Sequence, residues 1–123
     1  MSNEEIEAVA KITKMLNIKV ASHTSGGSAI TKAVECGLHS VEHGHWLDNK
    51  TVDLMKKNNT FYVPTLLVNE RNFDCKENEK FKSSKNWKWL ELSREAKWVS
   101  LKKAIKSNIK IATGTDAGFM LPH

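Results

Sequence analysis

The sequence predicts an α/β fold in which parallel strands are covered by helices. Four segments with apolar residues at helical spacing alternate with four short runs rich in β-branched residues. Each short run ends at a glycine, a proline or a polar loop, which turns the chain before the next helical segment. Because parallel strands need long crossover connections and helices usually provide them, this order favours strands that lie side by side in one sheet.

The first two elements are a helix over residues 3–16 and a strand over residues 18–22. Apolar residues recur at helical spacing through the first segment, and Ser2 or Asn3 can cap it ahead of an acidic first turn. The second segment is a short β-rich run that ends at His23, after which two glycines break the pattern.

A second helix is predicted over residues 28–36. Gly37 follows it at the position where a left-handed C-terminal cap is expected. The next strand covers residues 40–42 and ends at His43 and Gly44, since glycine and the polar sequence that follows are typical of a loop.

The third helix begins at a cap, either Asp48 or Asn49, and runs through Asn58. The third strand covers residues 60–63. Pro64 closes that strand, because proline has no backbone N–H to donate to a sheet.

The last predicted pair is a helix over residues 82–107 and a strand over residues 109–113. Between the third strand and this helix, residues 69–85 are charged and without pattern, which predicts a loop or a lid. One stripe of the long helix is expected to pack against the sheet, at Leu90, Arg94, Trp98, Leu101 and Ile105.

Length and composition limit the classes of protein that this chain can belong to. It has 123 residues, 40% of them hydrophobic and 27% charged, which fits one globular domain or part of one and excludes a disordered or collagen-like chain. No apolar run is long enough to span a membrane and the N-terminus is acidic, so a cytoplasmic protein is expected. Cys36 and Cys75 lie in no metal-binding cluster and are expected to be free thiols.

The basic charge does not point to a nucleic-acid binder. The formal net charge is +5, and 17 of the 19 basic residues are lysines, whereas base recognition favours the forked guanidinium of arginine. Three tryptophans lie among lysines in residues 82–106 and could act as stacking platforms. A packing helix explains the same spacing more simply, so no nucleic-acid partner is expected.

Three polar residues follow strands at the point where each strand ends, and they form the candidate site. His23 and His43 end the first two strands, and Asp116 follows the fourth. In parallel α/β folds the carboxyl ends of the strands share one edge, where catalytic groups collect. Two imidazoles and one carboxylate suit Zn²⁺ or a similar divalent metal, and Asp116 could also accept a proton from a metal-activated water.

Each candidate also has a simpler interpretation. A single histidine at a strand end is usually a hydrogen-bonded loop residue, and Asp116 alone could be a turn residue. His39 precedes a strand, at the opposite end from the candidate site, and is interpreted as structural. His45 would share a face with His43 if the strand continued through Gly44. Roles stay open for three residues: His45, Thr65 (turn or substrate contact) and His123.

Four runs of sequence carry a resemblance to a known family. They are Val20–His23, Val34–Gly44, Val63–Thr65 and Ala112–Gly118, in this order and spacing. Together they resemble the second half of the barrel of the amidohydrolase superfamily, in particular its imidazolonepropionase-like branch, which includes Xaa-Pro dipeptidases. The resemblance covers nearly the whole chain and identifies residues 1–123 as part of a catalytic domain.

The resemblance implies a parallel (β/α) half-barrel that corresponds to strands five to eight of a TIM-like barrel. It implies that His23 and His43 are metal ligands on strands five and six. Asp116 would be the aspartate of strand eight, which binds metal and accepts the proton of the attacking hydroxide. The implied reaction is hydrolysis of amide bonds of the cyclic-amide or dipeptide type, with one or two divalent ions in the complete site and zinc favoured.

The sequence also departs from this family. Strands one to four are absent, and with them a His-x-His pair and a lysine or glutamate that bridges the metals. We therefore expect little turnover from the isolated chain. An alternative is an inactive half-barrel that associates with itself, as a homo-oligomer, or binds a partner.

Overall fold

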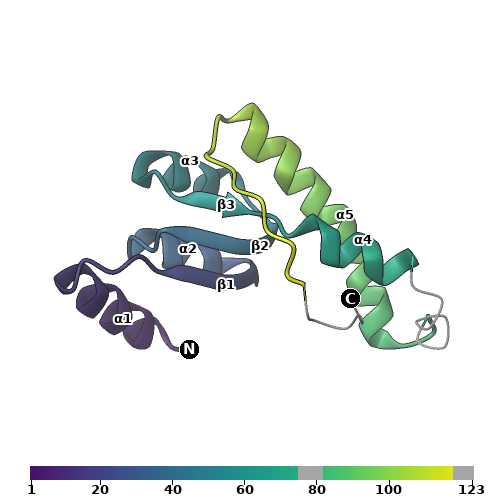
Figure 1. The fold of residues 1–123 in the computed structure, drawn as a ribbon, viewed down its shortest axis with the longest axis horizontal. Helices are drawn as coiled ribbons and strands as arrows, with labels where there is room; N and C mark the ends of the chain where they lie inside the picture. Colours follow the sequence, from purple (N-terminus) through teal and green to yellow (C-terminus); the bar gives the residue numbers. More distant parts are fainter. Residues whose placement is uncertain (75–81, 118–123) are drawn as a thin grey trace.

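The structure is a computed structural model that describes residues 1–74 and 82–117. Its centre is a parallel sheet of three strands in the order β1-β2-β3 (Figure 1). Strand β1 covers Ala21–Gly26, β2 covers Ser40–Trp46 and β3 covers Phe61–Val63. Both strand pairs are parallel. The predicted α/β fold with a parallel sheet is therefore confirmed.

The predicted fourth strand is present only as a short pairing beside β3. Ile111 forms an isolated parallel bridge with Tyr62. Tyr62 N donates to Lys110 O at 2.8 Å, and Ala112 N donates to Tyr62 O at 3.0 Å. The prediction of a regular strand over residues 109–113 is wrong in extent, because β3 itself has only three residues with which to pair. The segment nevertheless follows the free edge of β3, as the yellow trace in Figure 1 shows.

The helices follow the predicted order with local capping. Helix α1 (Asn3–Met15) begins with a capping box between Ser2 and Glu5. Helix α2 covers Ser28–Glu35, and α3 (Asn49–Asn58) is capped by the Asp48 side chain, which accepts from Thr51 N. Helix α5 covers Lys85–Lys106 and is capped by Ser84.

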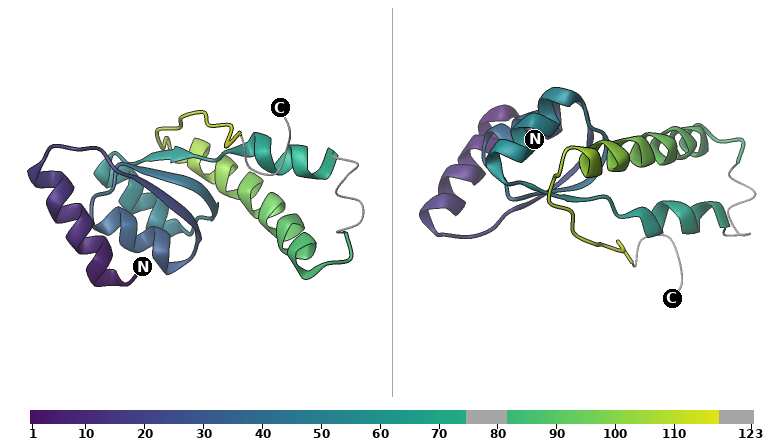
Figure 2. Two further views of the ribbon diagram at one scale, coloured as in Figure 1. Left: turned by 60° about the horizontal axis from the view of Figure 1, so that its bottom comes forward. Right: turned by 90° about the horizontal axis from the view of Figure 1, so that it is seen from above.

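Helix α4 (Leu66–Asp74) corrects the expected loop over residues 69–85. The charged residues of that stretch hid a helix whose apolar part lies just before it, at Leu66, Leu67 and Val68. Contact with α5 stabilises it: the carboxylate of Glu70 accepts three hydrogen bonds from the Arg94 guanidinium. Figure 2 shows α4 and α5 running side by side beyond the ends of the strands.

Two strands continue beyond their predicted ends. Strand β1 extends past His23 to Gly26, and β2 extends past His43 to Trp46. The pairing is irregular between Thr24 and Gly26, and it resumes where Gly26 lies opposite Trp46. A local distortion at this point therefore replaces the predicted end of the strand.

The core lies between the sheet, helices α2 and α3, and the C-terminal end of α5. Helix α1 packs at the margin of this body and buries none of its residues. Among the described residues, no helix combines the length and the apolar character needed to cross a membrane. The buried apolar cluster consists of Ile30, Val34, Val41, Leu47, Val52, Met55, Tyr62, Ala104 and Ile109.

The predicted packing stripe of α5 is wrong in part: Leu101 packs against the core, but two other members are exposed. Trp98 and Ile105 are 40% and 58% exposed. Beyond Trp87, the buried face carries small residues and one lysine, because a helix that approaches a strand closely selects small side chains over large apolar ones. The buried residues of α5 are Trp87, Ser93, Lys97, Ser100 and Ala104.

Candidate functional site

His23 and His43 come together where the regular pairing between β1 and β2 ends, just before its irregular stretch. Nε2 of His43 lies 2.9 Å from Nδ1 of His23. The two ring centroids are 4.5 Å apart, with an angle of 71° between the planes. Adjacent parallel strands thus aim one ring nitrogen of each histidine at the other.

This pair of nitrogens fits the requirement of a divalent metal ion. Zinc–nitrogen bonds of about 2.0–2.1 Å place two ligands of a tetrahedral ion about 3.3 Å apart. The observed separation of 2.9 Å between His43 Nε2 and His23 Nδ1 is a few tenths of an ångström shorter. A small outward movement of either ring would let both nitrogens share one ion.

Thr65 holds the other nitrogen of His43. Its Oγ1 lies 2.7 Å from His43 Nδ1, and both side chains are buried. Histidines that bind metals commonly use their second nitrogen in this way, which fixes the orientation of the ring. The hydroxyl of Thr65 therefore serves His43, a role outside the two that the sequence left open.

Asp116 approaches the same histidine from the Nδ1 side. Its Oδ2 lies 4.0 Å from His43 Nδ1, and the carboxylate side chain is 39% exposed. Within residues 1–74 and 82–117, no three histidine, cysteine or acidic side chains are grouped closely enough to hold an ion. The structure thus brings the two histidines together and leaves Asp116 beside them, outside their common centre.

Three residues of this site have a left-handed backbone. The φ angles are 67° at His43, 45° at Thr65 and 53° at Asp116. Residues other than glycine rarely adopt this conformation, and a β-branched threonine does so least of all. Each such residue costs about 1–3 kcal/mol and persists only where surrounding contacts impose it. Strain of this kind concentrates at functional sites.

Tyr62 imposes the conformation of His43. The hydroxyl of this buried tyrosine donates to the carbonyl oxygens of His43 at 3.2 Å and of Gly44 at 3.0 Å. Gly44 has a φ of +49°, and a Cβ at this position would lie 2.7 Å from a ring carbon of Tyr62. Only glycine therefore allows Tyr62 to bind the backbone that presents the His43 ring.

Lys97 is a site residue that the sequence analysis missed. It is 1% exposed, and its Nζ donates to Asn69 Oδ1 at 2.7 Å and to Thr65 Oγ1 at 3.2 Å. Burial lowers the pKa of Lys97 to about 8, although the negative charges of Asp116 and Glu70 oppose the shift. A lysine among so many others gave no signal, but the small residues at helical spacing around it mark a closely packed face.

Burial and the neighbouring charges both affect the protonation of His43. Burial lowers the pKa of His43, and the neighbouring His23 and Lys97 lower it further, while Asp116 has the opposite effect. A lowered pKa keeps the imidazole neutral at pH 7. Neutral imidazole is the form that binds metal ions.

His45 lies next to this site, because β2 continues through Gly44. Its ring stacks on that of His43 with centroids 6.0 Å apart, and it contacts the Trp89 ring edge-on. Burial and the nearby Lys97 lower its pKa from 6.5 to about 4. Its Nδ1 is buried and has no hydrogen-bond partner among the described residues.

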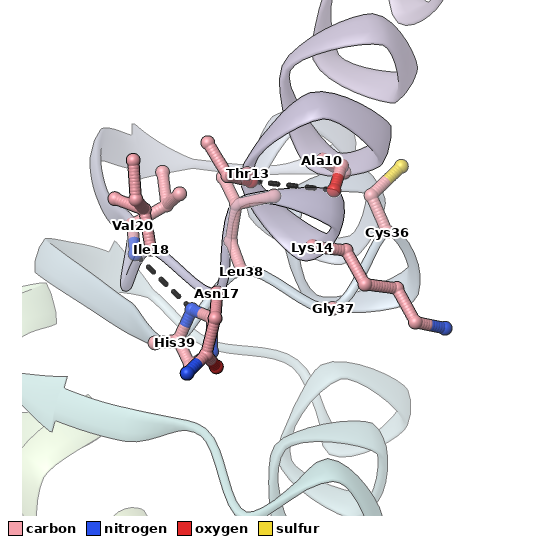
Figure 3. A pocket seen from close by; sticks show the side chains of 10 residues that line it. All are labelled: Ala10, Thr13, Lys14, Asn17, Ile18, Val20, Cys36, Gly37, Leu38 and His39. Atoms are coloured by element: carbon pink, nitrogen blue, oxygen red, sulfur yellow. Dashed lines mark hydrogen bonds between the residues drawn. The ribbon is translucent and has the colours of Figure 1, made fainter.

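The remaining candidates lie elsewhere. His39 is at the other end of the sheet, where its Nδ1 accepts a hydrogen bond from Val20 N at 3.1 Å, as the dashed line in Figure 3 shows. Figure 3 also shows the hollow of about 280 Å³ that His39 lines with Cys36, a free thiol. His39 is therefore a structural residue, as predicted. Cys75 and His123 lie outside the described residues.

Comparisons with known proteins agree with this architecture. Ochratoxinase from Aspergillus niger is 29% identical over 115 residues, which is 94% of this chain and 24% of the relative. Its crystal structure superposes with a TM-score of 0.83 at 28% identity, over 94% of this chain and 25% of that one. A Xaa-Pro dipeptidase solved with methionine in its active site gives a TM-score of 0.73 at 32% identity, over 96% of this chain and 29% of that one.

The chain thus spans about a quarter of the length of these relatives. This partial coverage agrees with the predicted half-barrel. The sequence model of the amidohydrolase family matches residues 1–122. With its parallel sheet, its paired histidines on adjacent strands and its likeness to two hydrolases, this chain belongs to the amidohydrolase family.

Proposed function

We propose that this chain supplies part of the active site of a metal-dependent hydrolase that cleaves amide bonds. The observation that carries the proposal is the 2.9 Å approach of His43 Nε2 to His23 Nδ1 between adjacent parallel strands. These two nitrogens would hold the ion, and Thr65 would keep the His43 ring in place from its other side. We infer zinc as the favoured metal, since it accepts imidazole and carboxylate ligands.

The ion supplies the chemistry that protein side chains lack. A bound divalent cation polarises an amide carbonyl and lowers the pKa of a water from about 15.7 to about 7. The role of His23 and His43 is to bind that cation in their neutral forms. The depressed pKa of His43 supports this role near neutral pH.

Asp116 is the residue that we propose as the proton acceptor. Its carboxylate lies beside His43 but remains 39% exposed, so it can reach both the site and an incoming substrate. A general base must come within about 2.6–3.2 Å of the proton that it removes. A carboxylate that also approaches the ion would meet that requirement when substrate is bound.

We propose a small amide or dipeptide as the substrate. This inference rests on the names of the two similar enzymes, ochratoxinase and Xaa-Pro dipeptidase. A complete pocket also needs the residues that the relatives carry outside the quarter matched here.

An inactive, self-associating half-barrel is the second candidate function. The apolar residues of α1 favour it, because Ile12, Met15 and Leu16 are 55%, 77% and 62% exposed. An uncovered apolar helix is typical of a surface that another chain or another part of the same protein covers.

Metal titration tests the main proposal. Calorimetric titration of Zn²⁺ into the metal-free chain should show binding that His23→Ala and His43→Ala each weaken by at least about tenfold. His39→Ala at the other end of the sheet is the matched control and should leave the affinity unchanged. Zinc affinity that survives both site substitutions would contradict the proposal.

A further inference from the structure

Lys97 has an unusual environment for a lysine. An ammonium group is strongly hydrated, and its transfer to the interior is unfavourable unless its three N–H donors find acceptors. Lys97 is 1% exposed, and its Nζ has three acceptors: Asn69 Oδ1 at 2.7 Å, Thr65 Oγ1 at 3.2 Å and Thr65 O at 3.3 Å. All three acceptors are neutral oxygens, so this lysine does more than neutralise a buried acid.

Lys97 binds the backbone and the side chain of one strained residue. Thr65 follows β3 with a φ of 45°, which a β-branched residue rarely adopts. The lysine holds both the carbonyl oxygen and the hydroxyl oxygen of Thr65 in this conformation. Asn69, one turn into α4, fixes the ammonium from the other side.

The hydrogen bonds continue from Thr65 to the two histidines. Lys97 can only donate, so Thr65 Oγ1 accepts from it, and the threonine hydroxyl is free to donate to His43 Nδ1 at 2.7 Å. The ring proton of neutral His43 then lies on Nε2, which donates to His23 Nδ1 at 2.9 Å. Each N–H or O–H hydrogen in this series therefore has one acceptor.

The same arrangement serves a metal-bound histidine. When Nε2 of His43 gives its lone pair to an ion, the ring proton must lie on Nδ1. Thr65 Oγ1 can accept that proton with its second lone pair while Lys97 still occupies the first. A hydroxyl suits this position because it can both donate and accept.

We infer that Lys97 is a positioning residue for the candidate metal centre: acting through Thr65, it fixes the orientation of His43 and, in the metal-free chain, also its tautomer. The role toward metal rests on the proposed function. The hydrogen-bond series from Lys97 to His23 is independent of the proposed function, because every contact in it lies within this chain.

The first test uses the metal-free chain and ¹⁵N NMR spectra of its histidine rings. In the wild-type chain at neutral pH, His43 should show protonated Nε2 and unprotonated Nδ1. Lys97→Met removes the donors at similar length and should produce a mixture of the two tautomers. Lys103→Met is the matched control, because Lys103 lies on the same helix and donates to Leu47 O at 2.6 Å without contacting Thr65. This control should leave the His43 signals unchanged.

The second test measures Zn²⁺ affinity by calorimetry in the same variants. Lys97→Met and Thr65→Val should each weaken binding by about 10–100-fold, the usual effect of removing a group that orients a metal ligand. The double variant should be no weaker than the single ones, since both act through one contact. Lys103→Met should bind zinc as the wild type does.

The outcomes separate this inference from the proposed function. Wild-type tautomer signals in folded Lys97→Met, or a wild-type His43 protonated on Nδ1, would overturn the inference. The tautomer of His43 in the wild-type chain is measured without any variant, so that outcome can overturn the inference even if Lys97→Met does not fold. Zinc affinity that survives His23→Ala and His43→Ala would instead remove the proposed function, while the tautomer result would still test the link from Lys97 to His43.

Discussion

At the scale of single residues, the site depends on how burial changes protonation. His43, His45 and Lys97 lie within one poorly solvated region, and burial is the largest cause of the lowered pKa at each of them. Their positive charges also oppose one another. Neutral imidazoles at His43 and His45 are the result, which suits metal binding at His43 and makes the chain sensitive to acid.

This sensitivity gives a prediction for His45, which is 4% exposed. Its pKa in the folded chain is about 4, below its ordinary 6.5, so between these values the unfolded state binds the additional proton. The contribution of neutral His45 to the free energy of unfolding is therefore complete above pH 6.5 and is lost as the pH falls towards 4. Urea denaturation should show this loss at about 1–3 kcal/mol for the wild type, and His45→Asn should reduce it.

His39→Asn is the matched control for that experiment. It removes a histidine at the far end of the sheet and leaves the surroundings of His45 intact. The wild-type dependence of stability on pH should persist in this variant. An unchanged pH dependence in His45→Asn would show that another group causes the loss.

At the scale of elements, the junction between β2 and β3 sets the direction of the His43 side chain. Tyr62 of β3 reaches across to the carbonyls of His43 and Gly44 in β2. That contact requires the ring of Tyr62 to lie against Gly44, where no Cβ can be accommodated. The distortion of β2 and the orientation of the histidine therefore have one cause.

Gly44→Ala tests this junction. It adds a Cβ 2.7 Å from the Tyr62 ring to a backbone with a φ of +49°, so overpacking and backbone strain act together. The expected loss is about 2–4 kcal/mol in the free energy of unfolding, measured with urea. Gly37→Ala has a φ of +82° and no atom within 4 Å of its Cβ, so it should lose only about 1 kcal/mol. Equal losses in the two variants would mean that the Tyr62 contact is unimportant.

At the scale of the whole molecule, the chain has apolar surface that its own described residues leave uncovered. Within residues 1–74 and 82–117, β1 pairs with β2 on one edge, and its other edge is open. Helix α1 lies beside that edge without burying any residue, and a hollow of about 480 Å³ lined by Met1, Ile6 and Val9 separates it from β1. Open strand edges and apolar helices promote association between chains.

We therefore expect the isolated chain to associate at micromolar concentration. Replacing Ile12 and Met15 together by glutamate should shift sedimentation in the ultracentrifuge towards the monomer, since both side chains are more than half exposed. Ile105→Glu changes an apolar residue of similar exposure on α5 and should leave the association unchanged. A wild-type chain that sediments as a monomer would count against the self-associating alternative.

Local sequence patterns predicted much of this fold. Capping residues such as Ser2 and Asp48 mark helix starts, because the groups they satisfy lie within one turn. The placement of His23 and His43 on adjacent strands follows from the alternation of helices and strands. The packed face of α5 and the helix α4 could not be predicted in this way, since Trp98 and Ile105 on α5 are exposed while small residues and Lys97 are buried.

The sequence by itself determined the α/β order, the parallel sheet and the two histidines at its carboxyl edge, because periodicity, caps and turn residues act over a few positions. Tertiary structure decided what surrounds those histidines. Lys97 binds Thr65, which lies 32 positions away in the sequence. The Tyr62 hydroxyl binds two carbonyl oxygens of β2 that lie 18 and 19 positions away. Such contacts depend on which distant groups share a buried space, so no local pattern could have identified the lysine that holds the threonine beside His43.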